Sequence, residues 1–328
     1  MRLNNTVKLE GSRFHIVRSV ALVVGISAAG TSAADANWIR PVGELVQLQP
    51  ADSDINALTA TSDGQRLLVD TDAALIIVDA ATFKAIGAPV AEHRPTSGLG
   101  VPLSRGTLLM VTTWADAPHG AKSGGGKAPQ QAGELLLVDW QAKKTQRLAT
   151  LSKEPKLLAV SADGSRAAVA YADDSVQIFN GTNGKSLLGP VKLIPATVVM
   201  GEHIDRLTSL ALSADGSRLA LGSGDVSVRL VDTNTGQHPL VLDQGSFQGV
   251  GFVHAPAKQL VFTPDGLRIL SLEQGGNFAL YDTASGKPLG PLVQVRTRVA
   301  ALAMGADGKR VIVGAVDGQL QSWALQPR

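Results

Sequence analysis

The chain has 328 residues, with 30 Lys and Arg against 28 Asp and Glu and no cysteine. The absence of cysteine excludes disulfides and a thiol-linked lipid anchor, so the chain must rely on its core for stability. Aromatic residues account for 4% of the sequence, which argues against stacking platforms for bases or sugars.

Residues 1–36 have the features of a signal peptide. Two arginines precede an apolar stretch of about eleven residues, Val20–Gly30, which is too short to cross a bilayer at about 20 residues. The small residues that follow predict cleavage after Ala36 or, as the second choice, after Ala33. A membrane anchor and a wrongly assigned start are the alternatives. We expect a periplasmic or secreted bacterial protein with no membrane span after cleavage.

The net charge of the chain also lies in this segment. Residues 1–36 carry four basic and two acidic residues, which leaves 26 of each kind in residues 37–328. Nucleic-acid binding requires a basic surface that neutralises phosphates. The balanced charge therefore predicts that nucleic acid is not a partner.

A short motif recurs along residues 37–328. It consists of an apolar run, an Asp-Gly turn followed by a basic residue, and two further apolar runs, the second ending in an acidic residue. Successive Asp residues lie 100, 52, 50 and 42 positions apart, so the first interval predicts a degenerate copy at Ser104–Gly106. The clear copies are Ser62–Arg66, Ser161–Arg166, Ser213–Arg218, Thr263–Arg268 and Gly305–Arg310.

This period is typical of the blades of a β-propeller, which repeat three or four short strands per unit. The repeat around Asp215 is the clearest, and it predicts antiparallel strands a to d at Leu207–Leu212, Arg218–Gly222, Ser227–Asp232 and His238–Leu242. We expect an all-β propeller of six four-stranded blades, with seven as the alternative.

The last repeat stops after its third strand, Gln319–Leu325. Residues Gly43–Gln49 alternate polar and apolar side chains before the first repeat, as an outer strand does. The sequence therefore predicts that this N-terminal segment completes the last blade and closes the ring, so that residues 37–328 form a single domain.

Polar and aromatic residues at fixed places in these repeats resemble those of the WD-repeat family, in a divergent bacterial, YVTN-like form. In that family each blade holds a His before strand a, a hydroxyl on strand b, an Asp in the b to c turn and a Trp on strand c. Trp323 matches the Trp, with Phe179 and Tyr281 as substitutes, and the resemblance implies that His203 pairs with Asp225 through Ser223. The matching turn residues are Asp72, Asp173, Asp225 and Asp317.

We interpret these Asp residues as structural, because an Asp in a turn accepts hydrogen bonds from backbone N–H groups. No catalytic, metal or cofactor site is predicted. The Gly- and Lys-rich segment 120–128 lacks the spacing of a phosphate-binding loop, and residues 52–56 lack the central glycine and distant glutamate of a calcium loop. A Gly-x-Ser-x-Gly nucleophile motif is absent from the sequence.

Three connections are longer than the repeat requires, at residues 115–133, 194–206 and 243–256. We expect all three on the face of the propeller that carries the b to c and d to a connections. Loops on rigid scaffolds carry function, so this face is the predicted interaction surface for an unknown protein or peptide. Its candidate residues are Trp114, His119, His203, Phe247, Phe252 and His254.

We therefore expect a monomeric, non-catalytic interaction scaffold, as the WD-repeat resemblance implies. One alternative is an enzyme similar to the lactonase or sugar-hydrolysing propellers, which would hold a metal or an acid–base group in the channel. Another is similar to the quinone-cofactor or outer-membrane-assembly propellers, whose repeats carry a turn like Asp282–Lys287. Those repeats end in a Trp a few residues later, whereas Pro288 follows here.

Overall fold

The described part of the chain is entirely strands, turns and bends in the computed structural model. Within it, no helix has the length and apolar character needed to cross a membrane. The structure describes residues 38–48, 54–71, 74–87, 100–102, 107–113, 133–139, 142, 144–194, 198–199, 202–203, 206–237, 240–242, 255–293, 295 and 299–326.

The described strands form six sheets of three or four strands and one two-stranded sheet. We number the six larger sheets as blades in chain order. Blade 1 contains β2 (Ile55–Ala60), β3 (Arg66–Thr71) and β4 (Leu75–Asp79). Blade 2 contains β5 (Gly100–Pro102), β6 (Thr107–Thr113), β7 (Gly133–Asp139) and β8 (Lys144–Leu151). Blade 3 contains β9 (Pro155–Val160), β10 (Arg166–Tyr171), β11 (Ser175–Asn180) and β12 (Ser186–Lys192).

Blade 4 contains β15 (Leu207–Leu212), β16 (Arg218–Ser223), β17 (Val228–Asp232) and β18 (Leu240–Leu242). Blade 5 contains β19 (Ala257–Phe262), β20 (Arg268–Glu273) and β21 (Phe278–Asp282). Blade 6 contains β22 (Val299–Met304), β23 (Arg310–Ala315), β24 (Gln319–Leu325) and the N-terminal β1 (Ile39–Gln47). The short strands β13 (Val198–Val199) and β14 (Glu202–His203) pair with each other.

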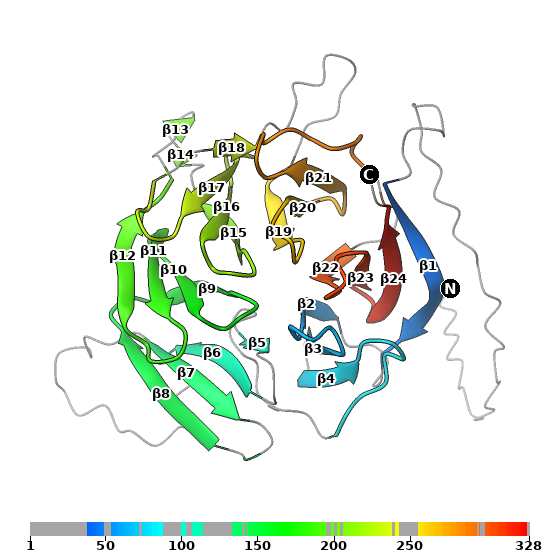
Figure 1. The fold of residues 1–328 in the computed structure, drawn as a ribbon, viewed down its shortest axis with the longest axis horizontal. Helices are drawn as coiled ribbons and strands as arrows, with labels where there is room; N and C mark the ends of the chain where they lie inside the picture. The colour runs from blue at the N-terminus through cyan, green and yellow to red at the C-terminus, as the bar shows by residue number, and fades with distance from the viewer. Residues whose placement is uncertain are drawn as a thin grey trace, which may run out of the picture.

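The sheets are arranged around a central axis as a β-propeller (Figure 1). Strands β2, β9, β15, β19 and β22 lie nearest the axis, and β1, β8 and β12 lie at the rim. Neighbouring strands within each blade run antiparallel, and the glycines of the Asp-Gly turns have positive φ, for example 70° at Gly216. The sequence prediction of an all-β propeller is therefore confirmed.

Apolar side chains fill the spaces between adjacent blades. Leu219 and Leu221 of β16 pack with Ala168 and Ala170 of β10, so one face of blade 4 is buried against blade 3. The opposite face of blade 4 presents Ala220, which packs in a cluster with strands of blade 5. Because successive side chains of a strand point to opposite faces, each blade contributes to two interfaces.

Strand β1 pairs antiparallel with β24, from Ile39 opposite Leu325 to Gln47 opposite Gln319. It begins four residues before the predicted Gly43, and its register shifts between Val42 and Val46. The sequence did not indicate the earlier start because Pro41 interrupts the strand pattern, although a proline is tolerated in an edge strand.

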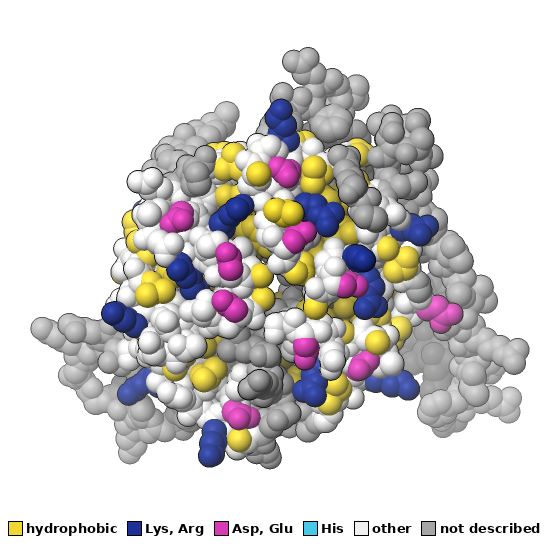
Figure 2. Space-filling model, in the orientation of Figure 1, with side chains coloured by type: hydrophobic (Ala, Val, Ile, Leu, Met, Phe, Trp, Pro, Cys, Tyr) yellow, Lys and Arg dark blue, Asp and Glu magenta, His cyan; other side chains and the backbone are white. Residues whose placement is uncertain are grey.

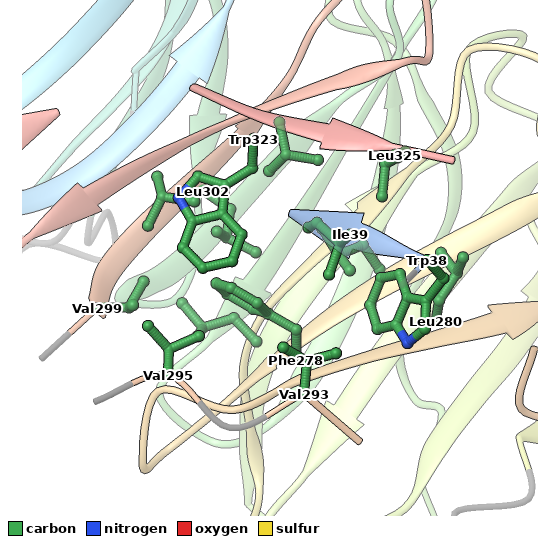
Figure 3. Close-up of a cluster of buried hydrophobic side chains, with 14 of the residues drawn as sticks. Trp38, Ile39, Phe278, Leu280, Val293, Val295, Val299, Leu302, Trp323 and Leu325 are labelled. Atoms are coloured by element: carbon green, nitrogen blue, oxygen red, sulfur yellow. The ribbon is translucent and has the colours of Figure 1, made fainter. Parts of the chain in front are cut away.

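Trp38 anchors the start of this strand on blade 5. Its indole Nε1 donates a hydrogen bond to the carbonyl of Pro291 at 2.9 Å, and a Cβ atom built on Gly290 would lie 2.5 Å from its ring. Trp38 and Ile39 belong to the buried cluster that also contains Phe278 and Trp323 (Figure 3). The chain therefore needs a glycine at position 290 for the indole to lie this close to the backbone.

The fourth strands of blades 4 and 5 differ in detail from the prediction of four-stranded blades. The fourth strand of blade 4 is described only from Leu240, and blade 5 has three named strands, with single bridges joining Phe278 to Val293 and Tyr281 to Pro288. The predicted degenerate turn at residues 104–106 lies outside the described residues, between strands β5 and β6.

The Asp-Gly turns of neighbouring blades lie against one another, which predicts unequal effects for two similar glycine substitutions. Gly64 and Gly266 both have φ of 67°, but a Cβ atom at Gly64 would lie 2.7 Å from the Cβ of Ala306, whereas one at Gly266 meets nothing within 4 Å. We expect Gly266→Ala to cost about 1–2 kcal/mol, from its left-handed backbone alone. Gly64→Ala should cost more, because blades 1 and 6 must also separate.

Urea unfolding of the two variants measures this difference. Equal losses of unfolding free energy would show that the turns of blades 1 and 6 do not press on each other.

Candidate functional site

A central channel of about 850 Å³ lies between the innermost strands. Its described lining comes mainly from β2, β9, β15, β19 and β22. The volume lies within the range of small-molecule and cofactor sites, about 300–1,000 Å³. The channel is therefore the concave feature around which we analyse the described residues.

We define the loop face as the end of the ring with the b to c turns and d to a connections, and the turn face as the end with the Asp-Gly hairpins. A register shift occurs near the loop-face end of five innermost strands, namely β2, β9, β15, β19 and β22. Such bulges redirect side chains at the rims of sheets. At each shift, one residue of the innermost strand has no residue opposite it on the second strand. These bulged residues are Asn56, Lys156, Thr208, Lys258 and Ala300.

Four of these bulged residues line the channel, and Lys156 is the exception. Asn56 and Lys258 are exposed, Thr208 is half-buried and Ala300 is buried. The loop-face mouth of the channel is therefore polar on blades 1, 4 and 5 and apolar on blade 6.

Small side chains line the channel at the turn face. They occupy the position directly before the Asp of each described Asp-Gly motif, so the repeat itself places them there. These residues are Ser62, Ala162, Ala214, Pro264 and Ala306.

The side chain of Gln259 joins three blades across the channel wall. Its Nε2 donates to the carbonyl of Leu302 at 2.7 Å, and the Leu302 N–H donates to its Oε1 at 2.7 Å. A longer contact of 3.5 Å runs from the same Nε2 to the carbonyl of Leu58. A single carboxamide therefore bonds blade 5 to blade 6 and approaches blade 1.

Hydroxyl groups join blades 4 and 5 near the loop face. Thr208 Oγ1 and Ser209 Oγ both donate to the carbonyl of Ala257, at 2.8 and 2.9 Å. These bonds give the Ala257 carbonyl two donors at the end of an edge strand, where the sheet itself supplies no partner on that side.

Charged side chains make the corresponding contacts between blades 3 and 4. Lys156 Nζ donates to the carbonyl of Leu207 at 2.8 Å, and the Leu207 N–H donates to Asp174 Oδ1 at 3.0 Å. Lys156 and Asp174 also form an ion pair of 3.3 Å. The ammonium group of Lys156 is therefore engaged in contacts between blades 3 and 4.

The predicted turn residue Asp173 lies in the turn between β10 and β11. It accepts bonds from Lys153 Nζ at 2.7 Å and from the Ser175 hydroxyl at 2.6 Å, and these lower its pKa to about 2. Asp317 accepts a longer bond of 3.4 Å from the Gln319 N–H, and Asp72 lies outside the described residues.

Asp225 occupies the equivalent turn of blade 4. Its carboxylate accepts bonds from the Ser227 N–H at 3.0 Å, from the Ser227 hydroxyl, and from Arg229 at 3.0 Å. Burial opposes its ionisation, but the bonds from Arg229 and Ser227 outweigh burial and lower its pKa to about 2. The arrangement orients a turn and presents no reactive group.

Of the expected link from His203 through Ser223 to Asp225, the structure describes the Ser223 and Asp225 part. The Ser223 hydroxyl meets the Asp225 backbone N–H at 3.5 Å, while the carboxylate turns to Ser227 and Arg229. His203 lies in β14, and its side chain is outside the described part. The remaining candidates for the interaction face lie outside the described residues: Trp114, His119, Phe247, Phe252 and His254.

Trp323, Phe179 and Tyr281 are buried on the third strands of their blades. The Trp323 ring meets Phe278 edge to face, with centroids 5.6 Å apart (Figure 3). Its indole Nε1 has no hydrogen-bond partner among the described residues. These aromatic residues belong to the buried apolar clusters that lie between blades.

Sequence reasoning missed the bonds between the turns of adjacent blades. Arg166 donates to Asn234 Oδ1 at 2.7 Å and to the hydroxyl of Thr233, both in the next blade. Arg218 donates to Thr283 Oγ1 at 3.2 Å in the same way. The available signal was a Thr directly after the last Asp of strand c in these two blades.

The described surface carries interspersed charges. On the face shown in Figure 2, Lys and Arg side chains lie among Asp and Glu side chains around the ring. Within the described ranges, no group of three or more His, Cys, Asp and Glu side chains could hold a metal ion.

Comparison with known proteins adds distant similarity. The chain is 25% identical over 165 residues to the "66 kDa stress protein" of Physarum polycephalum, covering 48% of this chain and 26% of that protein. It is 24% identical over 201 residues to the "U3 small nucleolar RNA-associated protein 4 homolog" of Homo sapiens, covering 60% of this chain and 27% of that protein. No family model matches the sequence.

The chain thus spans about a quarter of the length of these curated relatives. The similarity and the ring of antiparallel blades together support a WD-repeat β-propeller.

The bonds of Asp225 predict a measurable contribution to stability. We expect Asp225→Ala to lower the unfolding free energy by about 1.5–3 kcal/mol, because the change removes charge-assisted bonds from a largely buried carboxylate and leaves Arg229 without its ion partner. Asp232→Ala, at a turn of the same blade whose hydrogen bonds are exposed to solvent, should cost less. Denaturant titration compares the two variants, and equal costs would refute the role given to Asp225.

Three carboxylates predict a loss of stability in acid. Asp173, Asp215 and Asp225 have pKa values of about 2, below the value of about 3.9 in an unfolded chain. A group whose pKa is lower in the folded state stabilises the protein above the unfolded value, and this stability is lost as the pH falls through the folded value. The urea midpoint should therefore fall mainly between pH 4 and pH 2, and less steeply in Asp215→Asn. A midpoint that is constant over this range would contradict the prediction.

Proposed function

We propose that the protein is a non-catalytic interaction scaffold that binds a protein or peptide across its loop face. The observation that carries the proposal is the bulge near the start of strands β2, β15 and β19, which presents Asn56, Thr208 and Lys258 at the channel mouth on this face. The resemblance of the repeats to the WD-repeat family supports the same assignment.

We further propose that the ring has six blades, is closed by β1 and acts as a monomer. The pairing of β1 with β24 and the anchoring of Trp38 on blade 5 support closure. The printed name of the human relative refers to a small nucleolar RNA. The balanced charge of residues 37–328 argues against direct nucleic-acid binding by this chain.

Export is part of the proposal and rests on the sequence of residues 1–36. We propose that a bacterial cell removes this segment as a signal peptide and that the propeller, of YVTN-like type, acts in the periplasm or outside the cell. The first described strand, β1, begins at Ile39, which follows the segment proposed to be removed.

Site-specific photo-crosslinking in cells that express the protein tests the binding face. A photoreactive amino acid at Asn56 samples the loop face, and one at Leu267, which is 60% exposed at an Asp-Gly turn, samples the opposite face. We expect a discrete crosslinked partner from position 56 and none from position 267. The same partner from both positions, or none from position 56, would contradict the proposal.

A further inference from the structure

The innermost strand of each blade is an edge strand, because it pairs with the second strand on one side and faces the channel on the other. In an antiparallel pair, successive residues direct their N–H and C=O groups alternately toward the partner strand and away from it. Every second residue of an innermost strand therefore points both backbone groups toward the channel.

The turn hydrogen bonds identify these residues. The Thr61 N–H donates to the Arg66 carbonyl at 2.9 Å and so points toward β3. Because the direction alternates along the strand, Ala60 and Leu58 direct their backbone groups toward the channel, whereas Thr59 faces β3. In the other blades the equivalent turn hydrogen bonds are donated by the N–H groups of Ser161, Ser213, Thr263 and Gly305, and the same alternation applies. The corresponding channel-facing pairs are Leu158 and Val160, Leu210 and Leu212, Leu260 and Phe262, and Leu302 and Met304.

Gln259 shows which chemical group fits this edge. Its carboxamide accepts from the Leu302 N–H and donates to the Leu302 C=O, with both bonds at 2.7 Å. A primary amide offers a donor and an acceptor side by side, which matches the N–H and C=O of one channel-facing residue. A carboxylate offers only acceptors and cannot bond the carbonyl.

The charge of the lining favours a neutral ligand. The described lining contains one acidic residue, Asp70, and one basic residue, Lys258. Half-buried apolar side chains, such as Leu157, Leu210 and Val261, lie between the backbone edges. The wall therefore combines neutral amide recognition with apolar contact.

We propose that the channel receives a peptide segment of the partner and that side-chain carboxamides of that segment, from Gln or Asn, bond the channel-facing N–H and C=O groups as Gln259 bonds Leu302. This deepens the proposed function and rests on it, because the partner is taken to be a protein or peptide. The loop-face mouth is the entrance, and the edges of β2, β9 and β15 supply the same paired groups as β22.

Titration with two capped tripeptides, acetyl-Gly-Gln-Gly-N-methylamide and acetyl-Gly-Glu-Gly-N-methylamide, tests the site by amide NMR, because the methylated cap leaves the Gln side chain as the primary carboxamide of the pair. We expect the Gln peptide to shift the backbone amides of Leu58, Ala60, Leu210 and Leu212, and the Glu peptide to bind at least about tenfold more weakly, because it leaves a carbonyl without its donor. Equal binding of the two peptides, or shifts confined to residues outside the channel, would overturn the proposal.

Chemical rescue provides a second measurement. Gln259→Ala removes the internal carboxamide, so propionamide should raise the melting temperature of this variant more than that of the unchanged protein, while propionate should not. Equal effects of the two compounds would overturn the proposal. Should the variant fail to fold, the tripeptide titration of the unchanged protein still decides.

The outcomes also separate this proposal from the proposed function. Crosslinks from position 56 without shifts in the channel would leave the loop-face scaffold standing and reject the channel site. Shifts in the channel without a crosslinked partner would support carboxamide binding and reject the scaffold role at that face.

Discussion

The structure depends on the need of every blade to bury both of its faces. A small sheet with apolar side chains on both sides is stable only when another sheet covers each side, and a ring supplies two neighbours to every sheet. In this chain β1 provides the fourth strand of blade 6, and Trp38 reaches back to blade 5. The first and the last described strands therefore lie in one sheet.

The polar groups follow from the same requirement. Each blade leaves backbone groups at its inner edge and at its turns, and side chains of the neighbouring blade bond many of them. Gln259 joins blades 5 and 6 at the channel, and Arg166 and Arg218 join successive turns at the opposite end. Apolar packing between blades is not directional, whereas these bonds fix how one blade sits against the next.

The repeat made the architecture predictable, because Asp-Gly turns and apolar runs specify antiparallel hairpins locally. Strand c of blade 4 ends at Asp232, where the sequence predicted. The start of β1 at Ile39 was missed, since its pairing with β24 depends on residues almost 290 positions away. The partners of Asp225 were also missed, because Arg229 lies on the neighbouring strand and carries no motif of its own. For side-chain bonding across blades, the sequence offered the Thr directly after the last Asp of strand c in blades 4 and 5, but it did not indicate the arginine that bonds it.

For the candidate site, the sequence predicted only the face of the propeller on which it lies. The repeat places its bulges and edges near the channel, but the pairing of Gln259 with Leu302 joins residues 43 positions apart in different blades. Several of the aromatic and histidine residues singled out in the sequence lie outside the described ranges, so the interaction surface rests on the geometry of the channel mouth.

Native-state hydrogen exchange tests closure of the ring by β1 most directly. The Leu48 N–H donates to the Gly318 carbonyl at 3.0 Å, and the Gln326 N–H donates to the Trp38 carbonyl at 2.8 Å, so both amides report on the junction. If β1 belongs to one cooperative ring, these amides should exchange with the same opening free energy as the paired amides of β10 in blade 3. Exchange of both amides at a much lower free energy, as at a fraying terminus, would contradict the account.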